Sequence, residues 1–353
     1  MSPLNRQSEY SRWLHRIALL TAGATFLLIF MGGLVTSHQA GMSVPDWPNS
    51  YGYNMFLFPP RLWIGGILYE HTHRLMATVV GMLSILMVII AWKTEHRRWV
   101  RWLAIAVLGG VIFQGVLGGL RVVLVKLDLA IVHACFAQAF FCLAMLMVIV
   151  TSRWWLAAAD LSNFSQGRKV IRLAIVTVCM IYAQLIIGAM MRHYQAGLAI
   201  PDLPLAYGKW LPPMNQTDLD AANHLRAWNL NLPPVTLGQI WLHFGHRLGA
   251  ILVTIHVCLL VSVILRKHRR PDLQIPAAVL AGLLVIQITL GVLTVYFRKP
   301  ADVASAHVAI GALVLATTFL IAVRAMRLYS LSFRAAAVGN QWAPATPTHS
   351  MAT

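Results

Sequence analysis

Long apolar segments recur along the whole chain, and short polar or basic segments separate them. Each segment is close to the roughly 20 residues that a helix needs to cross the hydrocarbon core of a bilayer. Because lipid offers no hydrogen-bond partner to backbone N–H and C=O groups, these segments are expected to be helices. The eight predicted spans cover residues 17–37, 70–92, 102–125, 129–151, 171–191, 238–265, 275–296 and 304–325.

The two halves of the chain carry the same landmarks in the same order. The segment QAGMSVPDWP at 39–48 is matched by QAGLAIPDLP at 195–204. The further matched pairs are His73-Arg74-Leu75 with His246-Arg247-Leu248, Gln114 with Gln287, Gly118 with Gly291, and His133 with His307. Each half has four spans, an even number, so both halves enter the membrane from the same side.

This repeat predicts the fold class and the domain organisation. We expect an all-α membrane protein whose eight transmembrane helices form two pseudo-symmetric four-helix bundles, at residues 17–151 and 171–325. Residues 1–16 would be a cytoplasmic N-terminus and residues 152–170 a cytoplasmic linker. Residues 326–353, which end in a Pro- and Thr-rich stretch, are expected to be a disordered cytoplasmic tail.

Composition and charge agree with a membrane protein. Of the 353 residues, 58% are apolar and 11% are charged, which excludes an ordinary soluble domain. Most of the 28 Lys and Arg residues lie before span one, after span eight, and between spans two and three, four and five, and six and seven. The positive-inside rule places these segments and both termini in the cytoplasm. The net charge of +17 therefore indicates topology and contact with the lipid bilayer, with no nucleic acid partner.

The N-terminal region predicts the compartment. It is short and basic and has no small-residue cleavage site after the apolar segment, so the first span is expected to be retained. No long Arg- and Ser-rich transit peptide precedes it, which favours a multi-pass protein of the bacterial plasma membrane (the inner membrane). The four cysteines fall inside predicted spans and are expected to be packing residues: Cys135, Cys142, Cys179 and Cys258.

Two predicted outer loops, at about 38–69 and 192–237, are too long to be simple connectors. Their Pro and aromatic content favours ordered caps over the outer ends of the spans. Anchoring of the aromatic side chains at the membrane interface is an equally good explanation.

Four histidines stand near the beginning of predicted spans at matched places in the two halves. His73 and His133 are 60 residues apart, and His246 and His307 are 61 residues apart. Such side chains are costly in a membrane and suggest function. Alternate helices of an antiparallel bundle run parallel and can lie diagonally, so two imidazoles can face each other across a flat macrocycle. The pattern therefore predicts two haem irons, each with two axial histidines.

Two alternatives apply to these histidines. Any one of them could be a buried side chain that is hydrogen-bonded to a neighbouring backbone group. Zinc suits the pattern less well than haem iron, because two histidines per site leave zinc short of its usual four ligands.

Charged residues adjoin the histidines. Arg74 and Arg247 directly follow His73 and His246, where a guanidinium could hold a haem propionate; extension to lipid headgroups is the alternative. Glu70 lies one helical turn before His73, and the second half has His243 in that place. A carboxylate beside a haem edge can take a proton or stabilise a cation, so Glu70 is the candidate catalytic residue. An ion pair with Arg74 is the alternative.

As a set, these features resemble the haem A synthase family: eight spans, Glu70-x-x-His73-Arg74, His246-Arg247, and histidines near the start of spans four and eight. The resemblance covers about residues 15–325. It implies an enzyme that oxidises the methyl group at C8 of haem O to a formyl group, giving haem A for terminal oxidases. The expected route is two successive hydroxylations and loss of water.

The resemblance also implies roles for the residues. His246 and His307 would hold a resident haem b, His73 and His133 the substrate or product haem, and Glu70 would take part in the reaction. One branch of the family carries a cysteine pair in an outer loop. The first outer loop here has no cysteine, so the chain resembles the cysteine-free branch.

The resemblance implies partners for the protein, and two other functions are possible alternatives. The family implies haem O synthase, the cytochrome oxidase assembly machinery and an unidentified electron acceptor as partners. A di-haem b electron-transfer protein is the main alternative, but such proteins usually place haems at two depths, whereas these four histidines lie near one face. A haem transporter or chaperone would need neither Glu70 nor a second fixed haem.

Overall fold

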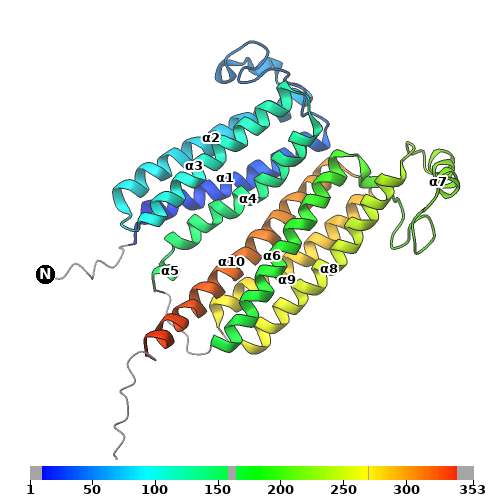
Figure 1. Ribbon diagram of the computed structural model, residues 1–353. Helices are drawn as coiled ribbons and strands as arrows, with labels where there is room; N and C mark the ends of the chain where they lie inside the picture. Colours follow the sequence, from blue (N-terminus) through cyan, green and yellow to red (C-terminus); the bar gives the residue numbers. More distant parts are fainter. Residues whose placement is uncertain (1–9, 158–163, 269, 340–353) are drawn as a thin grey trace, which may run out of the picture.

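The computed structural model describes residues 10–157, 164–268 and 270–339, and their regular structure is helical apart from two isolated β-bridges (Figure 1). Eight described helices are long and apolar enough to cross a membrane, which confirms the expected all-α membrane class. They are α1 (Arg12–Ser37), α2 (Gly66–Thr94), α3 (Arg98–Val123), α4 (Leu127–Thr151), α6 (Phe164–His193), α8 (Leu237–Lys267), α9 (Pro271–Tyr296) and α10 (Ala301–Gly339).

Short helices occupy the connections. They are α5 (Arg153–Ala157), η1 (Met55–Leu57), η2 (Pro60–Leu62), η3 (Ala196–Leu198) and α7 (Gln216–Asn229). All eight long helices begin before their predicted spans, and in α1 and α8 a polar side chain caps this end. At the start of α8, for example, the Thr236 hydroxyl accepts a hydrogen bond from the backbone N–H of Gln239 (3.2 Å), and the Gln239 side chain accepts one from the N–H of Thr236 (2.9 Å).

The ends of the chain and the linker are only partly described. The α10 helix continues to Gly339, beyond the predicted end of span eight at 325. The remainder of the predicted tail (340–353), residues 1–9 of the predicted N-terminal segment and residues 158–163 of the predicted linker lie outside the described residues.

The long helices pack as two groups of four (Figure 1). In the first group, α1 and α3 each pack against α2 and α4; in the second, α6 and α9 each pack against α8 and α10. The helices α2 and α4, which carry His73 and His133, are therefore diagonal to each other. So are α8 and α10, which carry His246 and His307. Contacts of α1 with α10 and of α4 with α6 and α10 join the two groups.

In both bundles, the interior near one end of the helices differs from the interior near the other end. We call the helix ends beside residues 38–65 and 194–236 the loop end, and the opposite ends the terminal end. The large apolar clusters of both bundles occupy the half near the terminal end, with fully buried side chains such as Met87, Val100, Leu260 and Leu273. All four predicted ligands lie in the other half, within three turns of the helix starts at the loop end.

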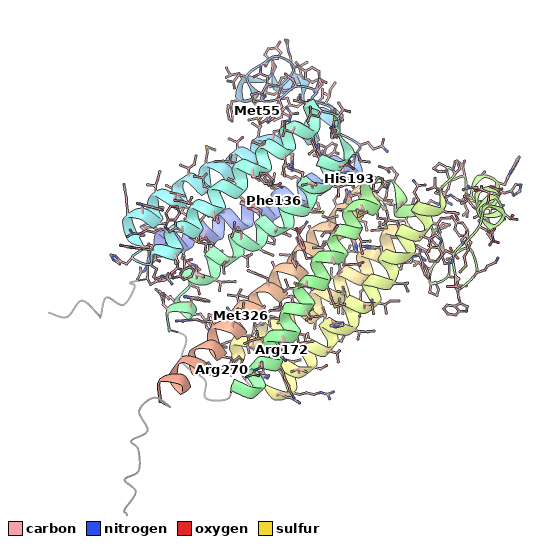
Figure 2. All side chains as sticks on the ribbon, viewed as in Figure 1. Met55, Phe136, Arg172, His193, Arg270 and Met326 are labelled. Atoms are coloured by element: carbon pink, nitrogen blue, oxygen red, sulfur yellow. The ribbon has the colours of Figure 1, made fainter. Side chains whose placement is uncertain are left out.

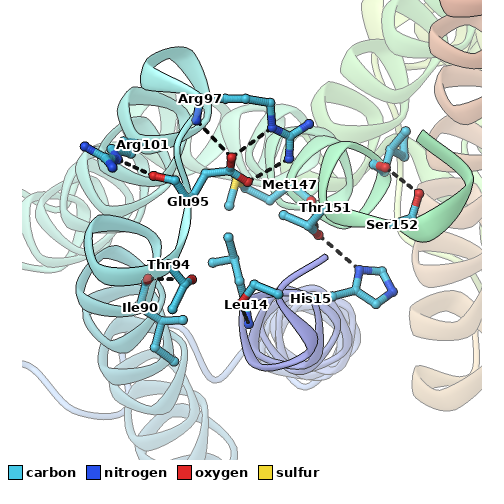
Figure 3. Close-up of polar contacts among 12 residues, drawn as sticks. Leu14, His15, Ile90, Thr94, Glu95, Arg97, Arg101, Met147, Thr151 and Ser152 are labelled. Atoms are coloured by element: carbon cyan, nitrogen blue, oxygen red, sulfur yellow. Dashed lines mark hydrogen bonds and ion pairs between the residues drawn. The ribbon is translucent and has the colours of Figure 1, made fainter. Parts of the chain in front are cut away.

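Polar contacts close the terminal end. Arg172 and Arg270 lie there, whereas Met55 lies at the loop end (Figure 2). In the connection between α2 and α3, the Glu95 carboxylate accepts hydrogen bonds from Nε and Nη2 of Arg97 at 2.9 and 2.7 Å (Figure 3). Burial acts to raise the pKa of Glu95, but these hydrogen bonds outweigh it and hold the pKa below its usual value.

Gly33 lies at the junction between the bundles, where a larger side chain should overpack the contact between two helices. A methyl group on Gly33 of α1 would lie 3.0 Å from Cβ of Ser305 on α10, whereas Gly23 of the same helix is exposed with nothing within 4 Å. We expect Gly33→Leu to cost about 1–3 kcal/mol of stability, because the helices cannot approach closely. The measurement is the thermal unfolding midpoint in detergent, with Gly23→Leu as the control. Equal midpoints for both variants would contradict the close junction.

Candidate functional site

Each of the four predicted ligands packs against a glycine of the neighbouring helix. The pairs are His73 with Gly32, His133 with Gly118, His246 with Gly188, and His307 with Gly291. A methyl group on these glycines would lie 3.0 to 3.2 Å from Cε1 of the opposing imidazole. A side chain larger than hydrogen would therefore displace each ring. The sequence repeat pairs Gly118 with Gly291, but it does not reveal that all four glycines fix the positions of the histidines.

The two histidines of each bundle lie on diagonal helices and close enough for their charges to interact. His73 is within electrostatic reach of His133, and His246 is within reach of His307. All four rings are half-buried. The Nε2 atoms of His73, His133 and His246 have no hydrogen-bond partner in the described part of the chain, whereas Nε2 of His307 lies 3.4 Å from the side-chain amide nitrogen of Gln287.

The arrangement fits haem iron better than a bare metal ion. In the ranges that the structure describes, no group of three or more His, Cys, Asp or Glu side chains could hold a metal ion. Two imidazoles on diagonal helices match the two axial ligands of a haem iron, whose four remaining ligands come from the macrocycle. The large apolar clusters lie in the half of each bundle near the terminal end, and the histidines lie in the other half.

In the second bundle, the other ring nitrogens have partners. The Nδ1 atom of His307 lies 3.1 Å from the backbone carbonyl of Gln287. The Gln184 amide lies 3.0 Å from Nδ1 of His246 and donates a hydrogen bond to the His246 carbonyl at 2.7 Å. An Nδ1–H that donates to a backbone carbonyl, as His307 can, is typical of metal-ligating histidines because it fixes the orientation of the ring. At His246 the Gln184 amide is the donor, so Nδ1 accepts; this contact also fixes the ring.

In the first bundle, Nδ1 of both His73 and His133 is buried without a hydrogen-bond partner. Gln114 donates to the backbone carbonyl of His133 (3.0 Å) and does not reach its ring. The first bundle thus orients its imidazoles less strongly than the second.

Two substitutions between the halves explain part of this difference. Gln184 lies one turn before Gly188, and the residue one turn before Gly32 is Leu28. Gly249 makes room for the amide, since a methyl group there would lie 2.1 Å from the Gln184 side-chain oxygen. The matching residue after His73 is Met76, which carries a long side chain where Gly249 has none.

The two loops fold on the same hydrogen bonds. In the first, the Asp46 carboxylate accepts from the backbone N–H groups of Tyr51 (2.7 Å) and Gly52 (2.8 Å). The matching residues of the second loop are Asp202, Tyr207 and Gly208, at 2.8 and 2.9 Å. The glycines adopt φ of +75° and +74°, which favours glycine. Partial burial acts to raise the pKa of Asp46, but these N–H groups and the Arg74 charge hold it below its usual value.

Arg74 fastens the first loop to α2. Its guanidinium donates to three loop carbonyls: Asp46 (2.7 Å), Asn49 (3.0 Å) and Val44 (2.7 Å). Arg247 does the same in the second loop, at the carbonyls of Leu205 (3.0 Å), Ile200 (2.9 Å) and Asp202 (2.8 Å). These contacts show that the loops are ordered caps.

Propionate binding by these two arginines stays a prediction. The terminal nitrogens of each guanidinium are engaged by the loop, so Nε is the donor that remains. In Arg247 this atom is buried without a partner among the described residues.

Glu70 belongs to the same loop clamp. Its side chain is 3% exposed, accepts from the backbone N–H of Val44 (2.9 Å), and forms the ion pair with Arg74 (2.9 Å). His243 holds the matching place in the second bundle, where its Nδ1 accepts from the N–H of Ile200 (3.2 Å). Both residues therefore anchor a loop, and only the first bundle does so with a carboxylate. A catalytic role for Glu70 stays a prediction.

Comparison with known proteins places this geometry in a family. The family model described as "Cytochrome oxidase assembly protein" matches residues 66–319, which contain all four histidines, both loop arginines and Glu70. The chain belongs to this family. The predicted membership of the haem A synthase family is thereby confirmed.

Three relatives cover most of the chain. The "Heme A synthase" of Shewanella oneidensis is 26% identical over 330 residues, 86% of this chain and 93% of its own length. That of Shouchella clausii is 29% identical over 281 residues (77% and 83%). That of Halalkalibacterium halodurans is 27% identical over 307 residues (84% and 92%).

Arg74 and Arg247 each fasten one loop, so replacing one arginine should loosen only the loop that it holds. Arg74→Met should expose the first loop, because it removes three hydrogen bonds from a charged donor, each contributing about 1.5–3 kcal/mol. Tryptic cleavage after Arg61, which is exposed, should then accelerate about tenfold or more. Arg247→Met should accelerate cleavage after Lys209 instead. Each variant is the control for the other, and equal acceleration at both sites in both variants would contradict independent clamps.

Proposed function

We propose that this protein is a haem A synthase, which oxidises the methyl group at C8 of haem O to a formyl group. The observation that carries the proposal is the set of four histidine–glycine contacts, two per bundle, in a chain of this family. The names of the relatives support it. The enzyme is then an oxidoreductase that acts on a CH group, through two successive hydroxylations and loss of water.

We assign different roles to the two bundles. Residues 171–325 would hold a resident haem b between His246 and His307, because the Nδ1 atoms of these rings have fixed partners. Residues 17–151 would hold haem O as substrate and haem A as product between His73 and His133, whose Nδ1 atoms have none. A less constrained pair suits a group that must enter and leave. When bound, haem b supplies one-electron redox chemistry.

We assign the carboxylate of the first loop clamp to the substrate side. This assignment is supported by the burial of Glu70 beside Arg74, one helical turn before His73. In this role, Glu70 accepts a proton from the substrate or stabilises positive charge that develops on it. Arg74 and Arg247 close the loops over the two sites, and their Nε–H groups donate to haem propionates.

The compartment and the partners follow from the family and from the charge pattern. We propose that the protein resides in the bacterial plasma membrane with both termini in the cytoplasm. Haem O synthase would supply the substrate, the cytochrome oxidase assembly machinery would receive the product, and an electron acceptor would reoxidise the enzyme.

A di-haem b electron carrier fits the structure less well. Transfer across a bilayer needs haems at two depths, whereas all four histidines lie in the half of the bundles near the loop end.

The direct test is co-expression with a haem O synthase in a host that lacks haem A, followed by chromatography of the extracted haems. We expect haem A to appear together with haem b. Haem b alone, with haem O unconverted, would favour the electron carrier.

Glu70→Gln tests the carboxylate. The amide retains an acceptor for the N–H of Val44 but cannot take a proton, so haem A yield should fall about 100-fold or more. Tryptic cleavage after Arg61 shows whether the loop remains closed.

The matched control is His243→Gln, which changes the equivalent loop anchor in the second bundle. It should leave haem A yield near that of the unchanged protein. Normal haem A production by the Glu70→Gln variant would refute the catalytic assignment.

A further inference from the structure

Basic side chains gather at the loop end where the two bundles meet. Arg121 lies on α3 and is within electrostatic reach of His73 and His133. Its Nη2 donates to the carbonyl of Gly41 at 3.0 Å, and its other nitrogens have no partner in the described part of the chain. The side chain is half-buried. Arg121 thus presents free N–H donors next to the first histidine pair.

Arg192 occupies a comparable place beside the second pair. It lies on α6, is half-buried, and is within electrostatic reach of His307. Its Nη2 donates to the carbonyl of Gly33 and to the Ser37 hydroxyl of α1, which fixes it across the junction of the bundles. Nε and Nη1 have no partner among the described residues.

Two further residues connect these arginines. His193, at the loop end of α6 (Figure 2), is within reach of both Arg121 and Arg192. Lys299, in the turn between α9 and α10, is within reach of Arg192 and donates to the Gln195 side chain at 3.2 Å. Burial, together with the charge of Arg192, lowers the pKa of Lys299.

The charge of this group is not balanced by the protein. No ion pair in the described ranges includes Arg121, Arg192 or Lys299. The acid that reaches Arg121 electrostatically is Glu70, whose carboxylate already pairs with Arg74. Half-buried cations without a counter-charge are costly, so an anion is expected to complete the site.

We propose that Arg121 binds a carboxylate of the haem held by the first histidine pair, and that Arg192 and Lys299 bind a carboxylate of the haem held by the second. This inference rests on the proposed function. A charged N–H donor makes a strong hydrogen bond to a carboxylate oxygen. Nε and Nη1 of Arg121 and Arg192 remain available as single donors, whereas in Arg74 and Arg247 the loop carbonyls occupy both terminal nitrogens.

The test uses the full-length protein, purified with its own haems, and the variants Arg121→Gln and Arg192→Gln. The readouts are the amount of each haem per protein and the midpoint potential of haem b. Arg192→Gln should lower that potential, because a nearby positive charge favours the reduced iron. A tenfold change in the reduction equilibrium corresponds to about 59 mV. Arg121→Gln should instead reduce the retained haem O and haem A at least threefold and leave haem b unchanged.

Two further variants separate charge from folding. Arg192→Lys keeps the charge and should restore most of the potential. Arg61→Gln removes an exposed basic residue of the first loop and should alter neither readout.

The outcomes distinguish the inference from the function on which it rests. Unchanged haem content and potential in both glutamine variants, with haem present in the unchanged protein, would overturn the inference alone. So would a loss of bound phosphatidylglycerol from mixed phosphatidylcholine nanodiscs without any effect on haem, because the anion would then be a lipid phosphate. An unchanged protein that retains no haem would overturn the proposed function as well.

Discussion

The contact between an imidazole ring and a bare glycine backbone is the constraint on which the rest of this structure depends. Polar rings are expensive inside a membrane-spanning bundle, and each ring here occupies a place that the neighbouring helix provides by omitting a side chain. The same contact occurs at His73, His133, His246 and His307. The two large apolar clusters lie toward the terminal end of the bundles, away from the four histidines.

The two bundles repeat the same fold, so the places where their residues differ point to different roles. Both loops are folded around an aspartate and fastened by an arginine, with the same backbone partners in both halves. The acceptor beside the clamp is Glu70 in one half and His243 in the other. One bundle braces its histidines and the other does not. The proposed division into a resident-haem bundle and a substrate bundle rests on these differences.

Sequence predicted the spans, the repeat and the four histidines well, because hydropathy and residue spacing report directly on membrane insertion and duplication. The helix ends were predicted less well, since caps such as Thr236 with Gln239 depend on a few local hydrogen bonds. The short helix α7 is too polar for a hydropathy pattern to detect.

The fine structure of the sites could not be predicted in this way. The Tyr-Gly pairs at 51–52 and 207–208 repeat in the sequence, and this repeat is a signal for the matched turns of the two loops. The partners of Arg74 and Arg247 could not be found, because they are backbone carbonyls that carry no sequence identity. The group around Arg121 and Arg192 comes from different helices and from both bundles. Only the packing of the bundles brings it together.

The two haem sites can be tested with a density map of the full-length protein in lipid nanodiscs. We expect a planar macrocycle in the second bundle with its iron bonded to both His246 and His307. A second macrocycle should lie between His73 and His133 when haem O is supplied. A macrocycle held by other residues, or imidazole rings turned toward lipid and away from each other, would contradict both proposed haem sites.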